Sequence, residues 1–536
     1  MKRANYRAPR EHRASLILPP PKVLPEVVRA NRTLLAAYRF EVLGRPVQEV
    51  RQSARHGMLT IPYTCIFDRQ TRPRHPDLAA PLVLTGHQPQ LYHPGVWLKN
   101  FLAGHLAEAV GGVAVNLNVD NDEAHQLTIR APVIVHGRTR VVEVPYLKAT
   151  NGLPYEELGE ESLLGGVAEG LRREGVAAHL CDATGDYWRR LDAARGRGSL
   201  AEVVTCARHQ LELDAGLNNF EALVSDIARL PEYRLFSLDI LSRLAEFHEA
   251  YNGGLATFRR VHHEKNPAQP IPDLAADGDR LEMPFWVWRS GGNRQRLWAE
   301  CAGDRYLLFI DGATEPFARL ARAALAAGAD QAVTQLHEQE SQGIKIRPRA
   351  LTLTLFARVF LGDVFIHGLG GAVYDKVTDE ITRAYYGVEP PQLVMATGTA
   401  LLPLEPFDVT RQDRRDLLRR LRDIRHHPDR LVDDSLRDTA EVRRLVDRKR
   451  DLIENRSETK PERDAAWHEL HEVNRRVAAL LDGEPQATQQ RLRDLNDELA
   501  QNAVLRNREY TFVLHPRDEL IDFYCEATAV RPGGGP

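Results

Sequence analysis

Between Pro81 and Val144, short apolar runs alternate with one stretch of helical periodicity. The runs are LVLT from Leu82, VAVNLNV from Val113 and APVIV from Ala131, and residues 96–110 separate the first two. A strand, a helix and a strand at this spacing predict a β-α-β unit, and therefore a parallel sheet with a right-handed crossover. A ligand site is then expected at the carboxyl ends of the strands.

A second strand-loop-helix pattern, LGDVFIHGLGGAVYDKVTDEITRAYY, runs from Leu361 to Tyr386, and the strand-like MATGTALLPL follows it. We expect these pieces to rejoin the first sheet. Between the two units, residues 156–265 place apolar residues at helical spacing, including FEALVSDIARL from Phe220. The segments LEMPFWVWR and RYLLFIDG come next and predict two strands that pair as a ribbon.

From Asp408 to Asn507 the composition changes to Arg, Asp, Glu and Leu. Apolar residues recur every three or four positions, as in helices packed along one stripe: Leu470, Val473, Val477 and Leu480, then Leu492, Leu495 and Leu499. Pro461 opens the first of these helices, and Gly483 and Pro485 separate it from the next. This favours an antiparallel helical hairpin over a single rod, and we expect it to join two copies of the chain in a homodimer.

Together these patterns predict an α/β fold with a Rossmann-like parallel sheet core, a helical insertion and a C-terminal antiparallel coiled-coil arm. The last segment, YTFVLHPRDELIDFY, has strand and turn character. The expected parts are an N-terminal arm with helices (1–80), the first part of the core (81–155), a helical connecting region (156–280), the second part of the core (281–407), the helical arm (408–507) and a return segment (508–536).

Composition narrows the classes of partner. A net charge of -3 gives no reason to expect a polyanion, and acidic residues interleave the Arg-rich residues 411–450, so we expect no nucleic acid. No apolar run is long enough to span a bilayer, and the basic N-terminus has too short an apolar core for a secretory signal. Five scattered cysteines are typical of reduced thiols. We therefore expect a cytoplasmic protein with a small-molecule substrate.

The segment LVLTGHQPQLYHPGVWLKN, from Leu82 to Asn100, has the strongest active-site character. It carries Thr85, Gly86, His87, Gln88, His93 and Lys99 between a predicted strand and a predicted helix. A polar glycine-containing loop that enters a helix gathers backbone N–H groups and the positive end of the helix dipole, which suits a phosphate. An ordinary strand-to-helix turn is the alternative interpretation.

An acidic segment, Asn118-Val119-Asp120-Asn121-Asp122-Glu123-Ala124-His125, ends the second strand of the first unit. Asp120 and Asp122 point the same way at a strand end, so they could hold Mg²⁺ against phosphate oxygens. Alternatively, Asp122 or His125 deprotonates an attacking amine. A hydrated acidic turn without a function also fits this pattern.

The third candidate is the glycine loop after the later strand, with His367, Gly368, Gly370, Gly371 and Tyr374. Its glycines let the backbone approach a ligand closely, although Val373 leaves the dinucleotide fingerprint incomplete. Upstream, Arg347 could clamp a carboxylate or a phosphate, or belong to a surface charge cluster. No P-loop motif occurs.

Three of these motifs resemble the bacillithiol biosynthesis cysteine-adding enzyme family. TGHQPQLYHPGVWLKN is similar to its Thr-Gly-Gln-Gln loop, VNLNVDNDEAHQ to its acidic segment, and IRPRAL with IHGLGG to its Arg-Pro segment and Gly-Gly loop. The order of a Rossmann core, a helical connecting region and a late coiled coil also agrees. The resemblance implies that Thr85, Gly86, Gln88 and Lys99 line the ligand site. It further implies that Asp120 and Asp122 form an acidic wall and that Arg347 with Gly370 and Gly371 closes the site.

The resemblance implies a ligase that joins the carboxyl group of cysteine to the amino group of a glucosamine-malate glycoside, or a relative that uses another amine. We expect a phosphorylated or nucleotide ligand such as ATP or ADP, with Asp122, His125 or His87 in catalytic roles. Lys99, Arg347 and the loop amides would stabilise negative charge. The alternatives are a nucleotidyl-transfer or adenylylating enzyme, whose His-x-Gly-His signature is absent, and a non-catalytic dimeric scaffold or sensor.

Overall fold

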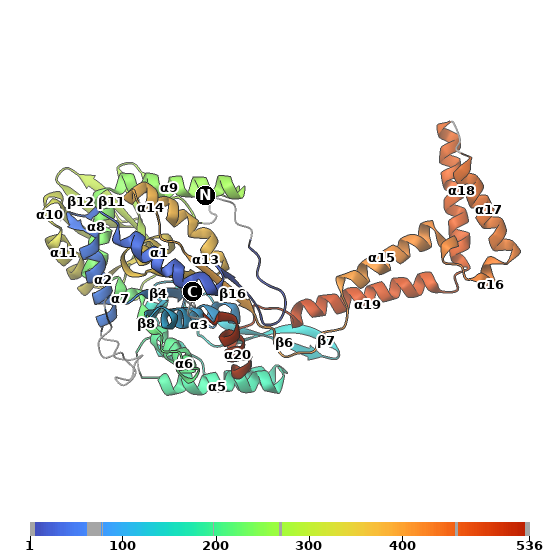
Figure 1. Ribbon diagram of the computed structural model, residues 1–536, viewed down its shortest axis with the longest axis horizontal. Helices are drawn as coiled ribbons and strands as arrows, with labels where there is room; N and C mark the ends of the chain where they lie inside the picture. Colours follow the sequence, from blue (N-terminus) through green and yellow to red (C-terminus); the bar gives the residue numbers. More distant parts are fainter. Residues whose placement is uncertain are drawn as a thin grey trace, which may run out of the picture. The chain divides into compact units, whose positions relative to one another are not determined.

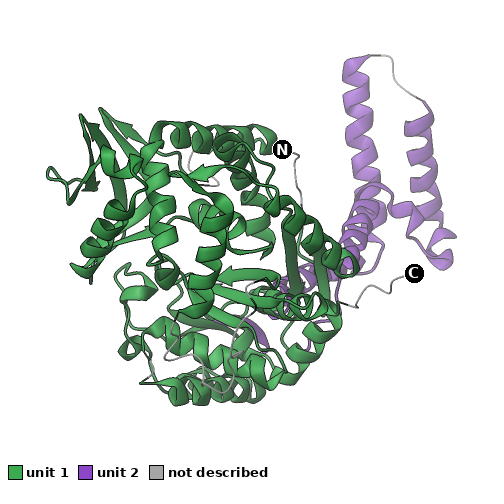
Figure 2. Cartoon of the chain, turned by 60° about the vertical axis from the view of Figure 1, so that its left-hand side comes forward, with its two compact units in different colours: residues 1–133, 142–402, 508–536 green, residues 134–141, 403–507 purple. Residues whose placement is uncertain are grey.

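The computed structural model describes residues 6–61, 77, 79–196, 198–266, 271–455 and 459–530. The chain forms two compact units, shown in Figure 2. Unit 1 comprises residues 1–133, 142–402 and 508–536, and unit 2 comprises residues 134–141 and 403–507. Among the described residues, no helix combines the length and the apolar character needed to cross a bilayer.

The main sheet of unit 1 has six strands in the order β1-β16-β15-β4-β5-β8 (Figure 1). They are β1 (Ala14–Leu18), β16 (Val394–Thr399), β15 (Val364–His367), β4 (Leu82–His87), β5 (Val113–Asn118) and β8 (Phe220–Leu223). All neighbours are parallel except β1, which is antiparallel to β16. The predicted β-α-β unit is confirmed, because α3 (Pro94–Ala109) connects the parallel strands β4 and β5.

Helices surround this sheet. The described helices of unit 1 are α1 (Leu24–Ala36), α2 (Val47–Thr60), α3, α4 (Val167–Arg173), α5 (Ala178–Ala194), α6 (Leu200–Asp214), α7 (Val224–Ile227), α8 (Pro231–Ser242), α9 (Leu244–His262), α10 (Arg322–Ala326), α11 (Asp330–Ser341), α12 (Ala350–Phe356), α13 (Leu369–Tyr374), α14 (Lys376–Tyr386) and α20 (Arg517–Thr528). A π-helical turn, Ala357–Leu361, extends α12. The helical character predicted for residues 156–265 is therefore largely confirmed.

A second, antiparallel sheet has the order β13-β12-β11-β10-β14, with β9 on β10. Its strands are β9 (Ala276–Asp277), β10 (Arg280–Arg289), β11 (Gln295–Ala302), β12 (Arg305–Ile310), β13 (Ala318–Ala321) and β14 (Ile344–Pro348). LEMPFWVWR and RYLLFIDG are strands as predicted, but β11 lies between them, so they do not pair with each other. Within residues 281–407, only β15 and β16 join the main sheet. Phe285 and Leu308 of the second sheet share one hydrophobic core with Leu84 of the main sheet.

Three further predictions need correction. Phe220–Leu223 was expected to be helical, but all four residues are buried and form β8 beside β5. The last segment was expected to be strand and turn, but it forms a 3-10 turn and then α20. Within 1–80, residues 62–76 and 78 lie outside the described residues, and the described part is no separate arm, because β1 belongs to the main sheet.

The N-terminal helices are tied to the sheet by a buried ion cluster. Arg51 and Arg55 of α2 both pair with Asp363, which precedes β15, at 2.8 and 3.0 Å. Asp363 also accepts a hydrogen bond from the backbone N–H of Leu82 at the start of β4. Two small hairpins complete the strands, β2 (Glu41–Val42) with β3 (Arg45–Pro46), and β6 (Thr128–Val135) with β7 (Arg138–Pro145).

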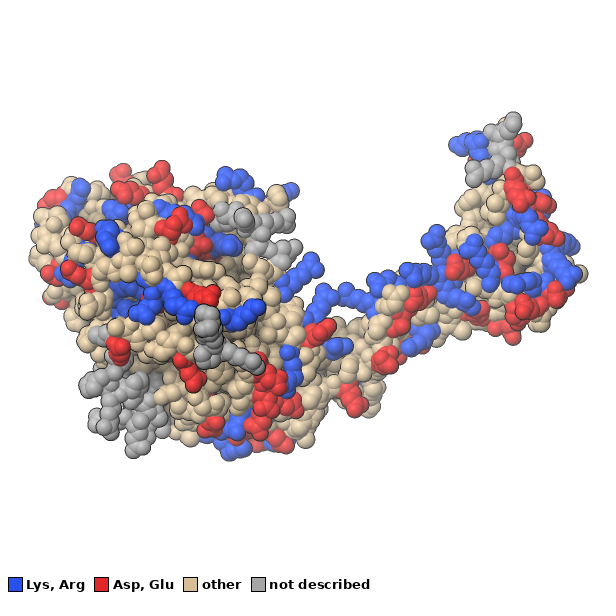
Figure 3. All heavy atoms as spheres, viewed as in Figure 1, with Lys and Arg blue, Asp and Glu red and all other residues tan. Residues whose placement is uncertain are grey.

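Unit 2 is helical apart from the tip of the β6–β7 hairpin. Its helices are α15 (Arg411–His426), α16 (Asp434–Arg437), α17 (Ala440–Glu454), α18 (Lys460–Ala479) and α19 (Glu484–Leu505). The predicted division at Gly483 is confirmed, since Gly483 is the N-cap of α19. The expected hairpin of α18 with α19 is not formed, because α19 packs along α15 while α18 packs along α17. On the face that Figure 3 displays, basic and acidic side chains are interspersed over these helices.

Candidate ligand site at the carboxyl edge of the main sheet

The carboxyl ends of β15, β4 and β5 lie side by side at one edge of the main sheet. Thr85 of β4 is level with Ile366 of β15 on one side and with Asn116 of β5 on the other. The strand order reverses between β4 and β15, because the chain continues from β4 to β5 and β8 on one side and returns later to β15 and β16 on the other. Ligands of open parallel sheets bind at such a reversal. The three predicted motifs therefore begin at this edge.

Gln88 and Asp122 connect the loops that follow β4 and β5. Gln88 Nε2 donates a hydrogen bond to Asp122 Oδ2 at 2.7 Å. Arg294, in the turn between β10 and β11, forms an ion pair with Asp122 Oδ1 at 2.8 Å, and its guanidinium lies 5.0 Å from the ring centre of Trp286. The sequence analysis missed Arg294. The Gly291-Gly292-Asn293 segment before it indicates a turn, but nothing local indicates which part of the fold that turn approaches.

Asp120 lies at the same edge, but it is enclosed. It is 1% exposed, and its Oδ1 accepts a hydrogen bond from the backbone N–H of Ser225 at 2.9 Å. Burial, together with the nearby carboxylate of Glu156, raises the pKa of Asp120 to about 7. Asp120 and Asp122 thus have different partners, and the pair of free carboxylates that a Mg²⁺ site would need is not formed.

Lys99 reaches back from α3 to the end of β4. Its ammonium donates a hydrogen bond to the carbonyl oxygen of Gly86 at 2.7 Å, and the residue is 3% exposed. Burial lowers the pKa of Lys99 to about 7. Burial and the charge of Lys99 also lower the pKa of His87 to about 3, so His87 is a neutral imidazole at neutral pH. The ring of His87 contacts Tyr92 edge-on, with 5.0 Å between the ring centres.

The first turn of α3 does not present free amides to a ligand. His93 is its N-cap, and His93 Nδ1 accepts the hydrogen bond of the Gly95 N–H at 3.1 Å. Burial and the charge of Arg508 lower the pKa of His93 to about 4. A Cβ placed on Gly95 would lie 2.3 Å from the carbonyl oxygen of Gly398 and 2.5 Å from Arg508. The chain itself therefore fills the place where the sequence analysis expected an anion.

The loop after β15 is more open. A Cβ placed on Gly368 or Gly370 would meet no atom within 4 Å, whereas one on Gly371 would lie 3.0 Å from His367 Nδ1. His367 Nε2 lies 3.1 Å from Asp375 Oδ2. Burial alone would raise the pKa of Asp375, but the nearby Arg358 and His367 have the larger effect and hold that pKa far below its ordinary value. Gly368 and Gly370 thus border open space, while His367 is anchored to the following helix.

Three other residues predicted to belong to the site, Thr85, His125 and Tyr374, make no contact with the Gln88–Asp122–Arg294 cluster that the structure records. Thr85 is fully buried, and its hydroxyl donates to the carbonyl oxygen of Ile366 at 3.0 Å. The side chain of His125 is 74% exposed and lies 3.2 Å from Glu123. Tyr374 is exposed on α13.

Arg347 was expected to clamp a ligand, and the structure gives it a partner within the chain instead. The side chain is 0% exposed and binds both carboxylate oxygens of Glu156, at 2.9 and 2.7 Å. It also donates to Glu340 at 2.6 Å. The two-point contact of Arg347 is therefore made with a carboxylate of the chain itself, in the segment after β7, and the buried side chain is no part of a surface charge cluster either.

A buried network behind β5 and β8 was not predicted. Arg208 pairs with Glu212 and Glu221, each at 2.6 Å, and Asn100 also donates to Glu212. Burial alone would lower the pKa of His209, but Glu212 and Glu221 raise it to about 9. The sequence could have predicted the pair of Arg208 and Glu212, because residues four apart lie on one face of a helix. It could not have predicted Glu221 as a partner, because Glu221 comes from a different element.

His209, Glu212 and Glu221 are also the one group of three potential metal ligands found among the described residues. Arg208 already supplies a positive charge to both carboxylates, so a cation fits poorly there. No protein-family model and no curated protein sequence matches this chain.

Proposed function

We propose that this chain is a ligase that forms an amide bond between the carboxyl group of an amino acid, cysteine or a close analogue, and the amine of an amino sugar or a related molecule. The reaction is that of bacillithiol-type thiol biosynthesis. One observation carries the proposal: β8, β5, β4, β15 and β16 are parallel and the chain order reverses between β4 and β15, which supports a Rossmann-like core. The TGHQ loop, the acidic segment and the IHGLGG loop, which resemble the cysteine-adding family, follow β4, β5 and β15 at this edge, whereas the Arg-Pro segment lies in β14 of the second sheet.

The side chains at this edge suit proton transfer from an amine. Asp122, held in place by Gln88 and Arg294, is the proposed base, while His87, which is neutral at neutral pH and a weak base, is the proposed hydrogen-bond partner of the substrate. Lys99 supplies buried positive character next to His87. Since Arg347 is occupied by Glu156 and Glu340, we exclude it from the proposed ligand contacts.

A nucleotide such as ATP fits best beside the β15 loop, where Gly368 and Gly370 leave space for close approach of a ligand. When bound, it would supply the activation of the carboxyl group that amide formation in water requires. No metal enters the proposal, because Asp120 and Asp122 have separate partners.

Ligand-dependent melting and turnover test the proposal. ATP or ADP with cysteine should raise the melting temperature, since a ligand at one hundred times its Kd stabilises a fold by about 2.7 kcal/mol. His87→Ala and Asp122→Asn should each lower amide formation at least a hundredfold while the far-UV circular dichroism is unchanged. His337→Ala is the matched control, because His337 is an exposed histidine of α11 that belongs to none of the three motifs, and it should keep full turnover.

If ATP, ADP, cysteine and amino sugars all leave the melting temperature unchanged, the ligase proposal fails and a scaffold or sensor is favoured. Release of diphosphate without an amide product would favour a nucleotidyl-transfer enzyme instead.

We also propose that unit 2 is a coiled-coil-type arm that joins two copies. The long pairing of α15 with α19 and the exposed Leu418 on α15 support this. Light scattering of the full chain should give twice the monomer mass, and Leu418→Glu should return it to the monomer.

A further inference from the structure

Unit 2 carries a groove of about 760 Å³ that its own fold does not use. The groove lies along α18, at the last turn of α15 and the first turn of α19. Ile424, Trp467, Ala478 and Pro485 give it an apolar floor. Its length along α18, from Trp467 to Ala479, corresponds to about 18 Å at the ordinary rise of a helix. This is the span of about three helical turns of a partner.

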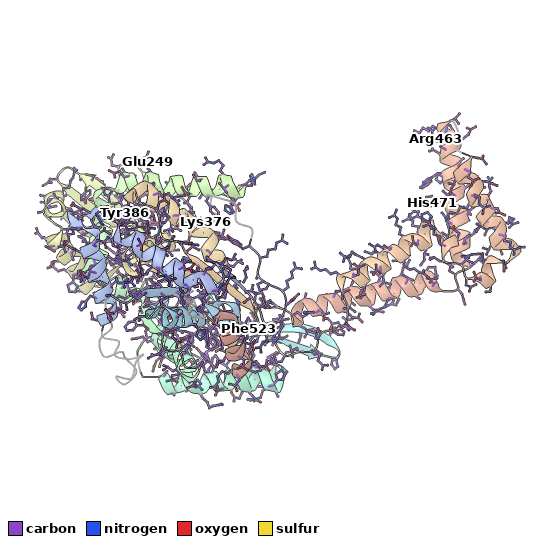
Figure 4. All side chains as sticks on the ribbon, in the orientation of Figure 1. Glu249, Lys376, Tyr386, Arg463, His471 and Phe523 are labelled. Atoms are coloured by element: carbon purple, nitrogen blue, oxygen red, sulfur yellow. The ribbon has the colours of Figure 1, made fainter. Side chains whose placement is uncertain are left out.

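The groove adjoins the core of unit 2, because Ile424 belongs to that core and Ala478 packs against it, but Trp467 lies outside it. Val473 and Val477 of α18 are buried against Val442 and Leu445 of α17. Trp467 in contrast is 56% exposed, and its ring centre lies 4.1 Å from that of His471. Figure 4 labels His471 on α18. A large exposed aromatic side chain that contributes little to its own core is typical of an interaction surface.

The charges that line the groove have one sign. Arg425 and Arg475 are the charged residues that line it, and no carboxylate does. Within the described part of the chain, Arg425 has no hydrogen-bond or ion-pair partner, and Arg475 pairs only with Glu472, at 2.9 Å. Elsewhere in unit 2 the arginines are commonly matched, as Arg448 is by Glu469. The groove therefore combines apolar side chains with one arginine that has no partner among the described residues, Arg425, and a second, Arg475, whose partner Glu472 lies outside the groove lining.

We propose that this groove is a docking site for an acidic amphipathic segment of another protein. An aromatic or aliphatic side chain of the segment would pack on Trp467 and Ile424, and its carboxylates would pair with Arg425 and Arg475. Tryptophan and arginine are the residues most enriched at the energetic centres of protein interfaces. A nucleic acid is disfavoured, because affinity for a phosphate backbone grows with the number of phosphates that cations neutralise, and two arginines line the groove. The proposal does not depend on the ligase function.

A phage-displayed library of random 12-residue peptides, selected on the full chain, tests this. The selected peptides should be enriched in Asp and Glu around a Leu, Phe or Trp. By fluorescence anisotropy of a labelled selected peptide, Trp467→Ala and the double variant Arg425→Glu/Arg475→Glu should each weaken binding at least tenfold. Arg493→Glu is the matched control, since Arg493 is an exposed arginine of the same unit that binds Gln490, and it should bind as the wild type does.

Several results would overturn the proposal. Peptides without acidic enrichment, or equal binding to Trp467→Ala and the wild type, would exclude this groove as an acidic-segment site. Displacement of the peptide by single-stranded DNA at lower concentration than by a second acidic peptide would assign the surface to nucleic acid. A fall in mass on Trp467→Ala would show that a second copy of this chain occupies the groove. Trp467→Phe, which keeps an aromatic surface, should retain most of the binding and guards against misfolding of the alanine variant.

Discussion

Replacing Arg347 by methionine tests whether its guanidinium serves the fold or a ligand. The side chain is fully buried and makes three charged hydrogen bonds, two to Glu156 and one to Glu340, between 2.6 and 2.9 Å. Methionine keeps much of the volume but leaves both carboxylates with one cation fewer. Breaking a buried pair in this way costs about 3–5 kcal/mol. Lys345 still lies 3.1 Å from Glu156 and Arg234 still binds Glu340, so we expect a loss near the lower end of that range.

The effect should depend on pH in a defined direction. Burial alone would raise the pKa of Glu340, but Arg347, with Arg234 and Arg229, lowers it from 4.5 to about 2. Because the folded-state pKa is the lower one, ionised Glu340 contributes stability that is present above about pH 4.5 and is lost as the pH falls toward 2. The difference between the wild type and Arg347→Met should therefore be largest near pH 7 and shrink below pH 4.

Guanidinium unfolding, followed by circular dichroism at pH 7 and pH 3, measures both effects. Adding Glu340→Gln to Arg347→Met should recover part of the loss, since it removes one unmatched charge. Arg493→Met, at an exposed position, is the control for removing an arginine. If Arg347→Met unfolds within about 0.5 kcal/mol of the wild type at pH 7 and instead loses ligand affinity, the assignment of Arg347 to the fold is refuted.

Two further substitutions test the edge of the sheet. Burial lowers the pKa of Lys99 from 10.5 to about 7, so the unfolded chain binds more protons between these values and wild-type stability should rise with pH across that window. Lys99→Met should remove this rise. If the melting temperatures of the two proteins change with pH in parallel from pH 6.5 to 9.5, this prediction is wrong. Gly86→Ala should lose about 1–3 kcal/mol, because its Cβ would lie 2.8 Å from the carbonyl oxygen of Leu117. A Cβ on Gly370 would meet no atom within 4 Å, so Gly370→Ala should unfold like the wild type but show a smaller nucleotide-induced shift in melting temperature. If Gly370→Ala were less stable than Gly86→Ala, this description of the two loops would be wrong.

The parts of the fold that the sequence predicted well are those with local signals. The apolar run at Leu82 and the glycine loop after His367 mark strands that the structure contains. β8 was missed because four buried residues, Phe220–Leu223, continue the apolar spacing of the neighbouring helices and carry no turn residue between strand and α7. Strand and buried helix cannot be separated by periodicity over so short a run.

The site was predicted in outline because each motif follows its own strand. What the sequence could not give was the identity of the partners. Arg347 binds Glu156, which is 191 residues away, and Asp122 binds Arg294, which comes from the other sheet. A pairwise contact over such a separation is decided by the packing of whole elements. The sequence around a charged residue therefore does not show whether its side chain binds a ligand or forms an ion pair within the chain.

The position of β1 has a consequence for how the chain is made. Its residues leave the ribosome well before those of β16, Val394–Thr399, which is its one strand partner in the described part of the chain. Arg51 and Arg55 are likewise synthesised long before Asp363, with which they form ion pairs. A nascent chain that has not yet reached these positions exposes a strand edge and two arginines destined for the interior. The interval before β16 is synthesised is therefore the stage at which this protein depends most on protection from aggregation, and removal of β1 would leave β16 as an unpaired edge of the main sheet.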